Sequence, residues 1–303
     1  MKELTDLLAE CLDKYNNYPL CDGNTCQCEF FCTANECSQG YCMSCMNHIQ
    51  RSPAPKFHYK CEKITYHYVL RFFNRFASEI AYIINSIKPN YFKDKTKLNV
   101  VSLGCGPGSE VYGFIQALRA KAPHVILDYQ GFDLTSIWGD VQEISKKVLS
   151  QTPHSIDFFD ENMFGAFGGF KDGPVDMLVL NYLLSDSQKF YHSDIEKIKF
   201  INEIVQFVIE NNIRNILFND NCYYGRSGLD SGVRMMLRLI HELKRSVNVS
   251  SVFRYFPTDG YTPSTTWKSY SSDKLCFPKL PSNTFDINVT CCRSKQILVH
   301  INS

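Results

Sequence analysis

Apolar and polar residues follow two alternating patterns along residues 98–245. Short apolar runs, typical of buried strands, are each followed by a segment with an apolar residue at every third or fourth position, which is typical of a helix. The pattern predicts strands at 98–104, 125–133, 154–159, 175–180 and 214–219, and helices at 109–121, 138–149, 194–210 and 230–245. This alternation favours a parallel sheet covered by helices on both faces.

The end of the chain continues with strand patterns. Residues 251–256 alternate like a strand, and 285–292 with 296–301 predict a hairpin that turns at Arg293-Ser294. The stretch 257–283 between them is rich in Pro, Ser and Tyr. A loop of this length is often functional, so it is either a substrate lid or a plain surface insertion.

A further helical pattern precedes the first strand. Apolar residues recur at helical spacing from Val69 to Ile87, and Pro89-Asn90 ends the helix. Residues 51–97 hold ten Lys or Arg and three Asp or Glu, whereas the first fifty residues hold two Lys and seven acids. Basic residues interleaved with aromatic ones fit a nucleic-acid backbone. An aromatic core stripe with an ordinary solvated face is the interpretation that we favour.

Composition limits the class of protein. The chain has 303 residues, 44% of them hydrophobic, and a net charge of +1, which suits one large domain with a small one. It contains no apolar run of about 18 residues, so we expect no membrane span. The N-terminus MKELTDLLAECLDKY predicts an acidic amphipathic helix and lacks the features of a signal peptide. We therefore expect a cytoplasmic protein.

Cysteines concentrate near the N-terminus, where eight of the fourteen lie between Cys21 and Cys61. Short spacings such as Cys42-x2-Cys45 can present two sulfurs to one zinc ion, which prefers four thiolate or imidazole ligands. We expect a module over residues 1–62 with structural zinc, two ions in all, that folds only with metal. The predicted ligands are Cys21, Cys26, Cys28, Cys32, Cys37, Cys42, Cys45, His48 and Cys61.

The ligand set and the zinc interpretation both leave alternatives open. His58 is as plausible outside the ligand set as inside it. Cys11 is left out, because it falls on the apolar side of the first helix. A secreted disulfide scaffold would also explain many cysteines, but the chain lacks a signal peptide, and some cysteines can simply be buried small apolar groups.

The first predicted strand of the sheet ends in the turn Gly104-Cys105-Gly106-Pro107-Gly108. Glycine has no Cβ, so the backbone can turn sharply and approach a ligand closely. The helix that follows directs free N–H groups at that ligand. Asp133 lies 25 positions after Gly108, at the end of the next predicted strand, where a carboxylate can bind ribose hydroxyls. These features predict a nucleotide-type site.

The segment LGCGPGSE followed by GFD resembles the cofactor-binding core of class I S-adenosylmethionine-dependent methyltransferases, over residues 98–220. The resemblance implies an α/β fold, a Rossmann-like, doubly wound, mostly parallel seven-stranded sheet closed by an antiparallel pair. It divides the chain into the zinc module at 1–62, a helical linker at 63–97 that covers the cofactor, and the methyltransferase domain at 98–303. One departure is Ser102, where the family usually has an acid.

The resemblance also implies which residues bind S-adenosylmethionine. Asn162 would accept a hydrogen bond from the adenine amino group, with Asp160 as its rival and a polar surface turn as the plain alternative. Leu134 would pack on the adenine, whereas Trp138 can be simple core. The full predicted set is Gly104, Cys105, Gly106, Pro107, Gly108, Glu110, Asp133, Leu134, Asn162 and Asn181.

Methyl transfer is expected beside the strand at 175–180. Asn181-Tyr182 loosely resembles the (Asn/Asp)-Pro-Pro-Tyr box of amino-group nucleic-acid methyltransferases, although both prolines are absent. Asp220 follows the next strand and is expected to act as a base or orienter, or else to cap the following loop. The predicted catalytic residues are Asn181, Tyr182 and Asp220.

The resemblance therefore implies an S-adenosylmethionine-dependent methyltransferase. We expect a macromolecular acceptor, because a small substrate would not need a docking module, and RNA or DNA ranks ahead of protein. Two alternatives stay open. One is a small-molecule methyltransferase in which the N-terminal module acts as a lid. The other is a non-catalytic scaffold that binds zinc or the cofactor.

Overall fold

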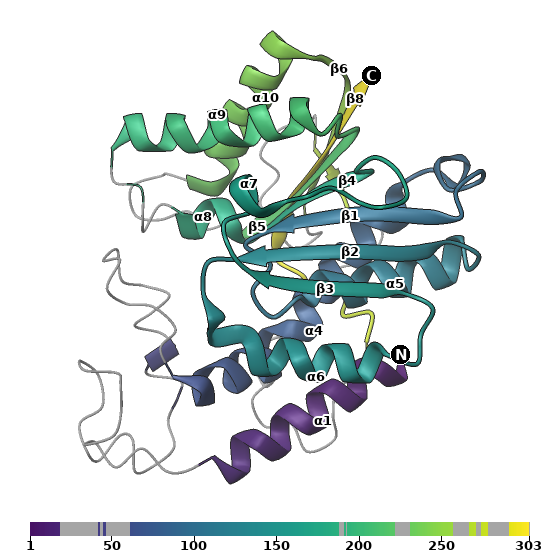
Figure 1. Cartoon of the computed structure of the whole chain (residues 1–303), viewed down its shortest axis with the longest axis vertical. Helices are drawn as coiled ribbons and strands as arrows, with labels where there is room; N and C mark the ends of the chain where they lie inside the picture. The colour runs from purple at the N-terminus through teal and green to yellow at the C-terminus, as the bar shows by residue number, and fades with distance from the viewer. Residues whose placement is uncertain are drawn as a thin grey trace.

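A mostly parallel sheet lies between two layers of helices in the computed structural model of the chain (Figure 1). The structure describes residues 1–18, 42, 45–46, 61–187, 191, 193–221, 231–256, 267–270, 274–277 and 291–302. Within this part the sheet has eight strands in the order β3-β2-β1-β4-β5-β8-β6-β7. The expected α/β class and parallel sheet are thereby confirmed.

The strands lie close to their predicted positions. They are β1 (Lys97–Leu103), β2 (Ile126–Asp133), β3 (Ser155–Asp160), β4 (Met177–Asn181), β5 (Asn215–Asn221), β6 (Asn248–Phe256), β7 (Lys268–Ser269) and β8 (Ser294–Asn302). Strands β1 to β5 are mutually parallel, so their carboxyl ends meet at one edge of the sheet. Strand β8 is antiparallel to both of its neighbours, β5 and β6.

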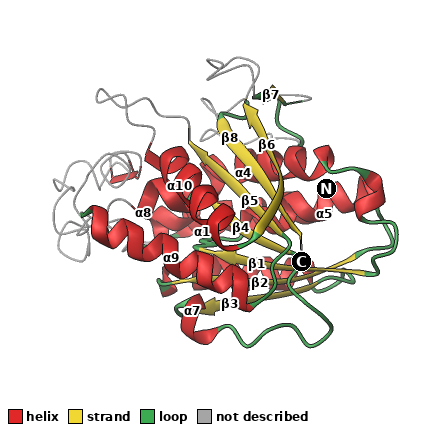
Figure 2. Ribbon diagram, turned by 90° about the horizontal axis from the view of Figure 1, so that it is seen from above, coloured by secondary structure: helices red, strands yellow, loops and turns green. Residues whose placement is uncertain are grey.

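The helices also follow the predicted pattern. Those described are α1 (Lys2–Asn17), α4 (Glu62–Ser86), α5 (Ser109–Lys121), α6 (Gly139–Leu149), α7 (Met163–Ala166), α8 (Leu183–Ser187), α9 (Asp194–Glu210) and α10 (Ser231–Ser246), with short 3-10 helices η1 (Pro89–Tyr91) and η2 (Ser136–Trp138). Figure 2 shows α8, α9 and α10 grouped together, with α4 and α5 on the other side of the sheet. Each group packs its apolar side against the sheet.

Successive residues of each central strand enter opposite cores. Val100 packs into the core beneath α1, α4, α5 and α6, and Val101 packs into the core beneath α8, α9 and α10. In β4, Val179 packs into the first of these cores and Leu178 into the second. This is expected, because side chains alternate between the two faces of a strand. The continuous apolar run of each parallel strand is therefore explained by burial on both faces.

The predicted terminal hairpin is wrong. Strand β8 pairs with β5 along one side and with β6 along the other, so neither edge is open to a strand at 285–292. Arg293-Ser294 is likewise not a hairpin turn, because Ser294 begins β8. The sheet instead gains β6 as the partner of β8, and β7 as a short eighth strand where seven were expected.

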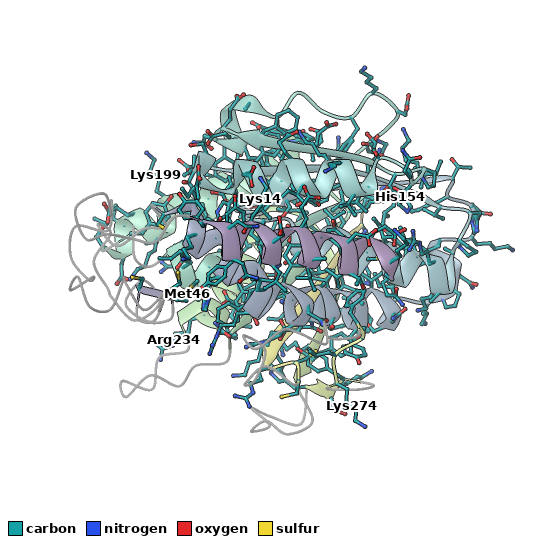
Figure 3. The ribbon with its side chains drawn as sticks, turned by 90° about the horizontal axis from the view of Figure 1, so that it is seen from below. Lys14, Met46, His154, Lys199, Arg234 and Lys274 are labelled. Atoms are coloured by element: carbon teal, nitrogen blue, oxygen red, sulfur yellow. The ribbon has the colours of Figure 1, made fainter. Side chains whose placement is uncertain are left out.

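Helix α1 packs on the main body of the molecule. Leu4, Leu7 and Cys11 are fully or almost fully buried in the core that α4 and α5 share. Burial raises the pKa of the Cys11 thiol to about 12, as suits a cysteine outside any metal site. In Figure 3, Lys14 lies on this helix, and its ammonium bonds the carboxylate of Asp140 on α6 at 2.7 Å. Of the helices in the described ranges, none is both long and apolar enough to cross a membrane.

Candidate functional site

The glycine turn connects β1 to α5 at the carboxyl edge of the sheet. Gly104, Gly106 and Gly108 have φ angles of +67°, +52° and +77°, a region that L side chains rarely adopt. The amides of Gly104 and Cys105 donate to the carbonyl of Phe132 at 2.7 and 3.1 Å, which fixes the turn against the end of β2. The three glycines of the sequence pattern therefore lie where the backbone takes a conformation that only glycine adopts without strain.

Asp133 lies directly beside this turn, as the sequence predicts. One carboxylate oxygen accepts the amide hydrogen of Gly106 at 2.9 Å, and the other accepts that of Thr135 at 3.1 Å. Partial burial of the group raises its pKa to about 6 despite these two hydrogen bonds. Each carboxylate oxygen has a further lone pair, so the group can still accept hydroxyl donors.

Aromatic and apolar side chains lie around the turn. Gly106 is buried, and a Cβ placed on it would be in ordinary contact with the Trp138 indole, 3.7 Å away. Leu134, next to Asp133, exposes 77% of its surface. An apolar side chain beside a ribose-type carboxylate is the arrangement that a purine would cover. That Leu134 and Asp133 contact S-adenosylmethionine stays a prediction.

Glu110 is enclosed by the protein itself. It is fully buried, and its carboxylate accepts hydrogen bonds from Ser102 Oγ at 2.7 Å, Tyr129 OH at 2.8 Å and Asn181 Nδ2 at 3.3 Å. Burial raises its pKa. Ser102, at the position where the resemblance implies an acid, thus donates to a carboxylate from the first turn of α5. Its three bonds connect Glu110 to β1, β2 and the end of β4, and its contact with a cofactor stays a prediction.

Asn181 ends β4 close to the glycine turn. Its amide nitrogen lies 3.4 Å from Ser109 Oγ, and its amide oxygen accepts from Asn219 Nδ2 at 2.9 Å. Asn219 lies near the carboxyl end of the neighbouring strand β5, in register with Asn181. Two amides in register at the carboxyl ends of parallel strands therefore connect β4, β5 and α5.

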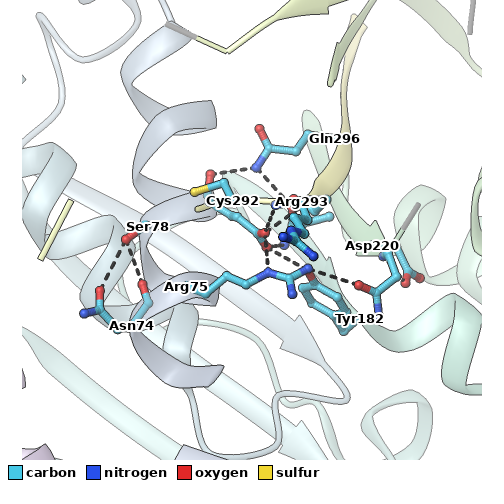
Figure 4. Close-up of polar contacts among 12 residues, drawn as sticks. Asn74, Arg75, Ser78, Tyr182, Asp220, Cys292, Arg293 and Gln296 are labelled. Atoms are coloured by element: carbon cyan, nitrogen blue, oxygen red, sulfur yellow. Dashed lines mark hydrogen bonds and ion pairs between the residues drawn. The ribbon is translucent and has the colours of Figure 1, made fainter. Parts of the chain in front are cut away.

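Tyr182 follows with a φ of +56°, which is uncommon for any residue other than glycine. Its hydroxyl donates to Glu79 Oε2 at 2.8 Å and accepts from Arg75 Nη2 at 2.9 Å (Figure 4). The guanidinium also donates to Glu79 Oε1 at 2.9 Å and to Asn221 Oδ1 at 3.1 Å. Helix α4 thus holds the Tyr182 ring in place from across the sheet edge.

Glu79 is the centre of this polar network. It is fully buried, and besides Arg75 and Tyr182 its carboxylate accepts from Asn219 Nδ2 at 3.1 Å and from the amides of Arg293 and Ser294 at 2.9 and 3.2 Å. Gln296 of β8 donates to the Glu79 carbonyl at 2.7 Å (Figure 4). Five donors therefore satisfy one buried carboxylate.

An aromatic row on α4 covers the turn. Tyr68, Phe72 and Phe76 lie one helical turn apart, with ring centroids 5.3 Å and 5.8 Å apart in sequence order. The row contacts Trp138 at one end, 5.2 Å from Tyr68, and Tyr182 at the other, 4.0 Å from Phe76. The row thus connects Trp138 in η2 to Tyr182 after β4, and the expectation that this helix covers a bound cofactor stays a prediction.

Two predicted site residues, Asn162 and Asp220, make hydrogen bonds within the protein itself. The Asn162 side-chain oxygen caps α7 by accepting the Phe164 amide at 3.1 Å, and this side chain is exposed. Asp220 is fully buried, and its carboxylate accepts from the amide and hydroxyl of Ser185 at 2.8 and 2.5 Å. Asp220 therefore ties α8 to β5. The loop at 222–230 that it was expected to cap lies outside the described residues, and its role as a base or orienter stays a prediction.

The predicted zinc ligands are mostly outside the described residues: Cys21, Cys26, Cys28, Cys32, Cys37 and His48, and with them His58. Cys42 and Cys45 are buried within the core that includes α1 and α4, and Cys61 precedes α4. Within the described ranges, no group of three or more His, Cys, Asp or Glu could hold a metal ion. The zinc module is therefore not confirmed.

Sequence reasoning missed Arg75, Glu79 and Gln296. The spacing of Arg75 and Glu79, four residues apart on one helix, is a signal for an ion pair. Gln296 carries no comparable local signal, because its partner Glu79 is 217 positions away. Its place in the network follows from strand pairing alone.

No protein-family model matches the chain, and no curated protein sequence matches it. Among solved structures, the chain is similar to a Listeria monocytogenes protein assigned to the class I S-adenosylmethionine-dependent methyltransferases (9% identity, 100% of this chain and 88% of that one, TM-score 0.48). It is also similar to the plantazolicin methyltransferase BpumL in complex with SAH (12%, 100% and 98%, 0.41). A third similar structure is the O-methyltransferase TomG from Streptomyces achromogenes in complex with SAM (11%, 77% and 90%, 0.42).

Proposed function

We propose that the protein is an S-adenosylmethionine-dependent methyltransferase. The observation that carries the proposal is the glycine turn with Asp133: three glycines with positive φ, and a carboxylate bonded to the central one at 2.9 Å. The resemblance of LGCGPGSE and GFD to the family adds support. In this assignment the Asp133 carboxylate accepts hydrogen bonds from the ribose hydroxyls, and Leu134 packs against the adenine. Asn162 lies one strand further along the same edge.

The methyl donor is a sulfonium, so the donor itself supplies the electrophilic carbon and a good leaving group. The protein has to hold an acceptor atom in line with the methyl group. In our proposal Asn181 and Tyr182 perform this positioning. Both are rigidly held, Asn181 by Asn219 and Ser109, and Tyr182 by Glu79 and Arg75. Burial raises the pKa of the Tyr182 hydroxyl well above its ordinary value, so this group orients and does not act as the base.

Donor binding tests the role of Asp133. We expect Asp133→Ala to weaken S-adenosylmethionine binding by about 1–3 kcal/mol in isothermal titration, because charged hydrogen bonds are lost. The pKa of the free carboxyl is about 6, so wild-type affinity should fall as the pH falls through that value, since the protonated group accepts less well. Asp133→Asn should remove this pH dependence. Unchanged affinity in Asp133→Ala would refute the ribose role.

The acceptor is proposed to be a macromolecule, with nucleic acid ahead of protein. Transfer of tritium from labelled donor to total RNA, DNA, protein and low-mass fractions of the source cell distinguishes the cases. Label in RNA or DNA is the expected result. Label only in the low-mass fraction would indicate a small-molecule enzyme, and donor binding with no labelled acceptor would indicate a scaffold.

Structural zinc in the N-terminal segment is also proposed, from ligand spacing alone. Elemental analysis of the purified full chain should find at least one zinc per molecule, and chelation should unfold that segment. A metal content below this would exclude the module.

A further inference from the structure

Helix α10 carries a row of basic residues on its outer face. Its members, which we call the α10 basic face, are Arg234, Arg238, His241, Lys244 and Arg245, and all five are exposed. Four of them follow the spacing i, i+4, i+7 and i+11, which places them along one side of a helix. Figure 3 labels Arg234, in the first turn of the helix.

These charges are available for a partner. Glu242 is the only acid on the helix, and it pairs with Arg245 at 3.0 Å. Arg234, Arg238 and Lys244 make no ion pair with any residue that the structure describes. The chain as a whole is nearly neutral, so this local excess is not a reflection of overall composition.

The opposite face of α10 is already used. Met236, Leu239 and Leu243 are completely buried in the core beneath α8, α9 and α10. A helix that lies on a bilayer has to insert its apolar face among the lipids. Apart from Leu237, which is 40% exposed, the apolar residues of α10 are buried, so an anionic membrane is the less suitable partner. A polyanion that binds from outside needs only the exposed cations.

The start of α10 adjoins the candidate methyl-transfer edge. A Cβ placed on Gly232 would come within 2.6 Å of Asp220 Oδ2, at the end of β5. Asp220 follows Asn219, which bonds Asn181. At a rise of about 1.5 Å per residue, Arg234 to Arg245 spans about 16 Å, enough to follow several phosphates of one strand. A strand that lies along α10 therefore leads towards Asn181.

We propose that the α10 basic face binds the phosphate backbone of a nucleic acid and guides it towards the carboxyl edge of the sheet. Three of its cations are guanidiniums, which bind phosphate through two parallel hydrogen bonds. Phosphate contacts position a strand without reading its sequence, and sequence or structure would be read elsewhere. The purpose of this binding rests on the proposed function, but the binding itself is measured without methyl transfer.

The test is fluorescence anisotropy with the full chain, a short labelled single-stranded RNA and a short labelled duplex DNA. Arg234→Glu/Arg238→Glu should weaken binding of at least one of them by roughly tenfold or more at low salt, and should reduce the salt dependence of log K by about 2. The matched control is Lys93→Glu/Lys171→Glu, which makes the same charge change. Lys93 and Lys171 are exposed and precede β1 and β4, at the opposite edge of the sheet.

The outcomes separate clearly. Loss in the α10 variant with retention in the control supports the proposal, and preference for RNA or DNA identifies the source of the phosphates. Equal binding by wild type and the α10 variant overturns it, as does equal loss in both variants, because only net charge would then matter. Wild-type binding to phosphatidylcholine–phosphatidylserine vesicles without nucleic-acid binding also overturns it. If the glutamate variant misfolds by circular dichroism, Arg234→Gln/Arg238→Gln replaces it.

Donor titration of the wild type is a separate measurement. If S-adenosylmethionine fails to bind while RNA binding still depends on Arg234 and Arg238, the proposed function fails and the α10 assignment holds. If S-adenosylmethionine binds but nucleic-acid binding does not depend on Arg234 and Arg238, the proposed function holds and the α10 assignment fails.

Discussion

Helices α4 and α10 both carry basic residues, but they use them in opposite ways. In α4 the Lys63 side chain is buried, and the Arg75 side chain, which is 11% exposed, is bonded to Glu79. In α10 Arg234 and Arg238 are exposed and lie opposite a buried apolar face. The charge excess that the sequence shows before β1 is thus partly inside the molecule. The more accessible positive surface in the described part lies on α10.

The difference follows from what surrounds each helix. Seventeen of the 25 residues of α4 are buried, because α1, α5, η2 and β8 pack against it. A polar group in such a place has to find partners from other elements, and those partners then hold each other in position. The cations of α10 remain hydrated and keep their affinity for a phosphate.

Glu79→Ala should have the largest effect of the changes considered. It removes the acceptor of five hydrogen bonds and leaves the Arg75 guanidinium without its buried counter-ion. Loss of one partner of a buried ion pair typically costs about 3–5 kcal/mol. Urea unfolding should show this loss of free energy of unfolding. Glu79→Gln, which keeps an acceptor oxygen, should lose less, and a loss below about 1 kcal/mol in Glu79→Ala would show that the network contributes little.

The fold was more predictable than this network. Alternating strand and helix patterns between 98 and 245 identified each central element, because each element's pattern reflects its own burial. The glycine turn and Asp133 were predictable too, since a fixed spacing along the chain brings them together across β1 and β2. Glu79 was not, because its partners come from β4, β5 and the start of β8, elements whose pairing no local pattern specifies. The misassigned hairpin has the same origin: β8 has a clear strand pattern, but its partners are β5 and β6.

Tyr182→Phe removes fewer hydrogen bonds from the polar network around Glu79 than Glu79→Ala does. The ring and its contact with Phe76 remain, but Arg75 and Glu79 each lose one hydrogen-bond partner. Leaving buried polar groups partly unsatisfied costs about 1–3 kcal/mol, so the expected loss is smaller than that of Glu79→Ala. Both variants measured by urea unfolding, with their double variant, give the coupling energy. Strict additivity would contradict a shared network.

The ion pair between α1 and α5 is more exposed than the Arg75–Glu79 pair and less exposed than the cations of α10. Glu3 binds Arg119 through two bonds of 2.6 and 3.0 Å, and the Arg119 side chain is 42% exposed. The hydrogen bond from Arg119 lowers the pKa of Glu3 to about 2. The stabilisation is present above the unfolded value of 4.5 and is lost as the pH falls towards 2. Because solvent screens the pair, Glu3→Gln should cost no more than about 1 kcal/mol at pH 7.

The comparison for this pair is made at acid pH. Wild type and Glu3→Gln should converge in urea midpoint as the pH falls through about 2, because Glu3 becomes protonated in the folded state only there, whereas in the unfolded state it is already protonated. A gap that persists unchanged at that pH would mean that α1 packing, and not the charge, is altered by the substitution.

Arg238→Met should have the smallest effect on stability, and Arg75→Met is its matched partner. Both substitutions remove a guanidinium and keep an apolar stem. On α10 the guanidinium is exposed and makes no described ion pair, so the free energy of unfolding should change by no more than about 0.5 kcal/mol. On α4 the same change leaves the buried Glu79 without its counter-ion, so the loss should be several-fold larger. Equal losses in the two variants would mean that Arg238 is engaged within the folded chain, and a cation that is already engaged cannot serve as a free contact for phosphate.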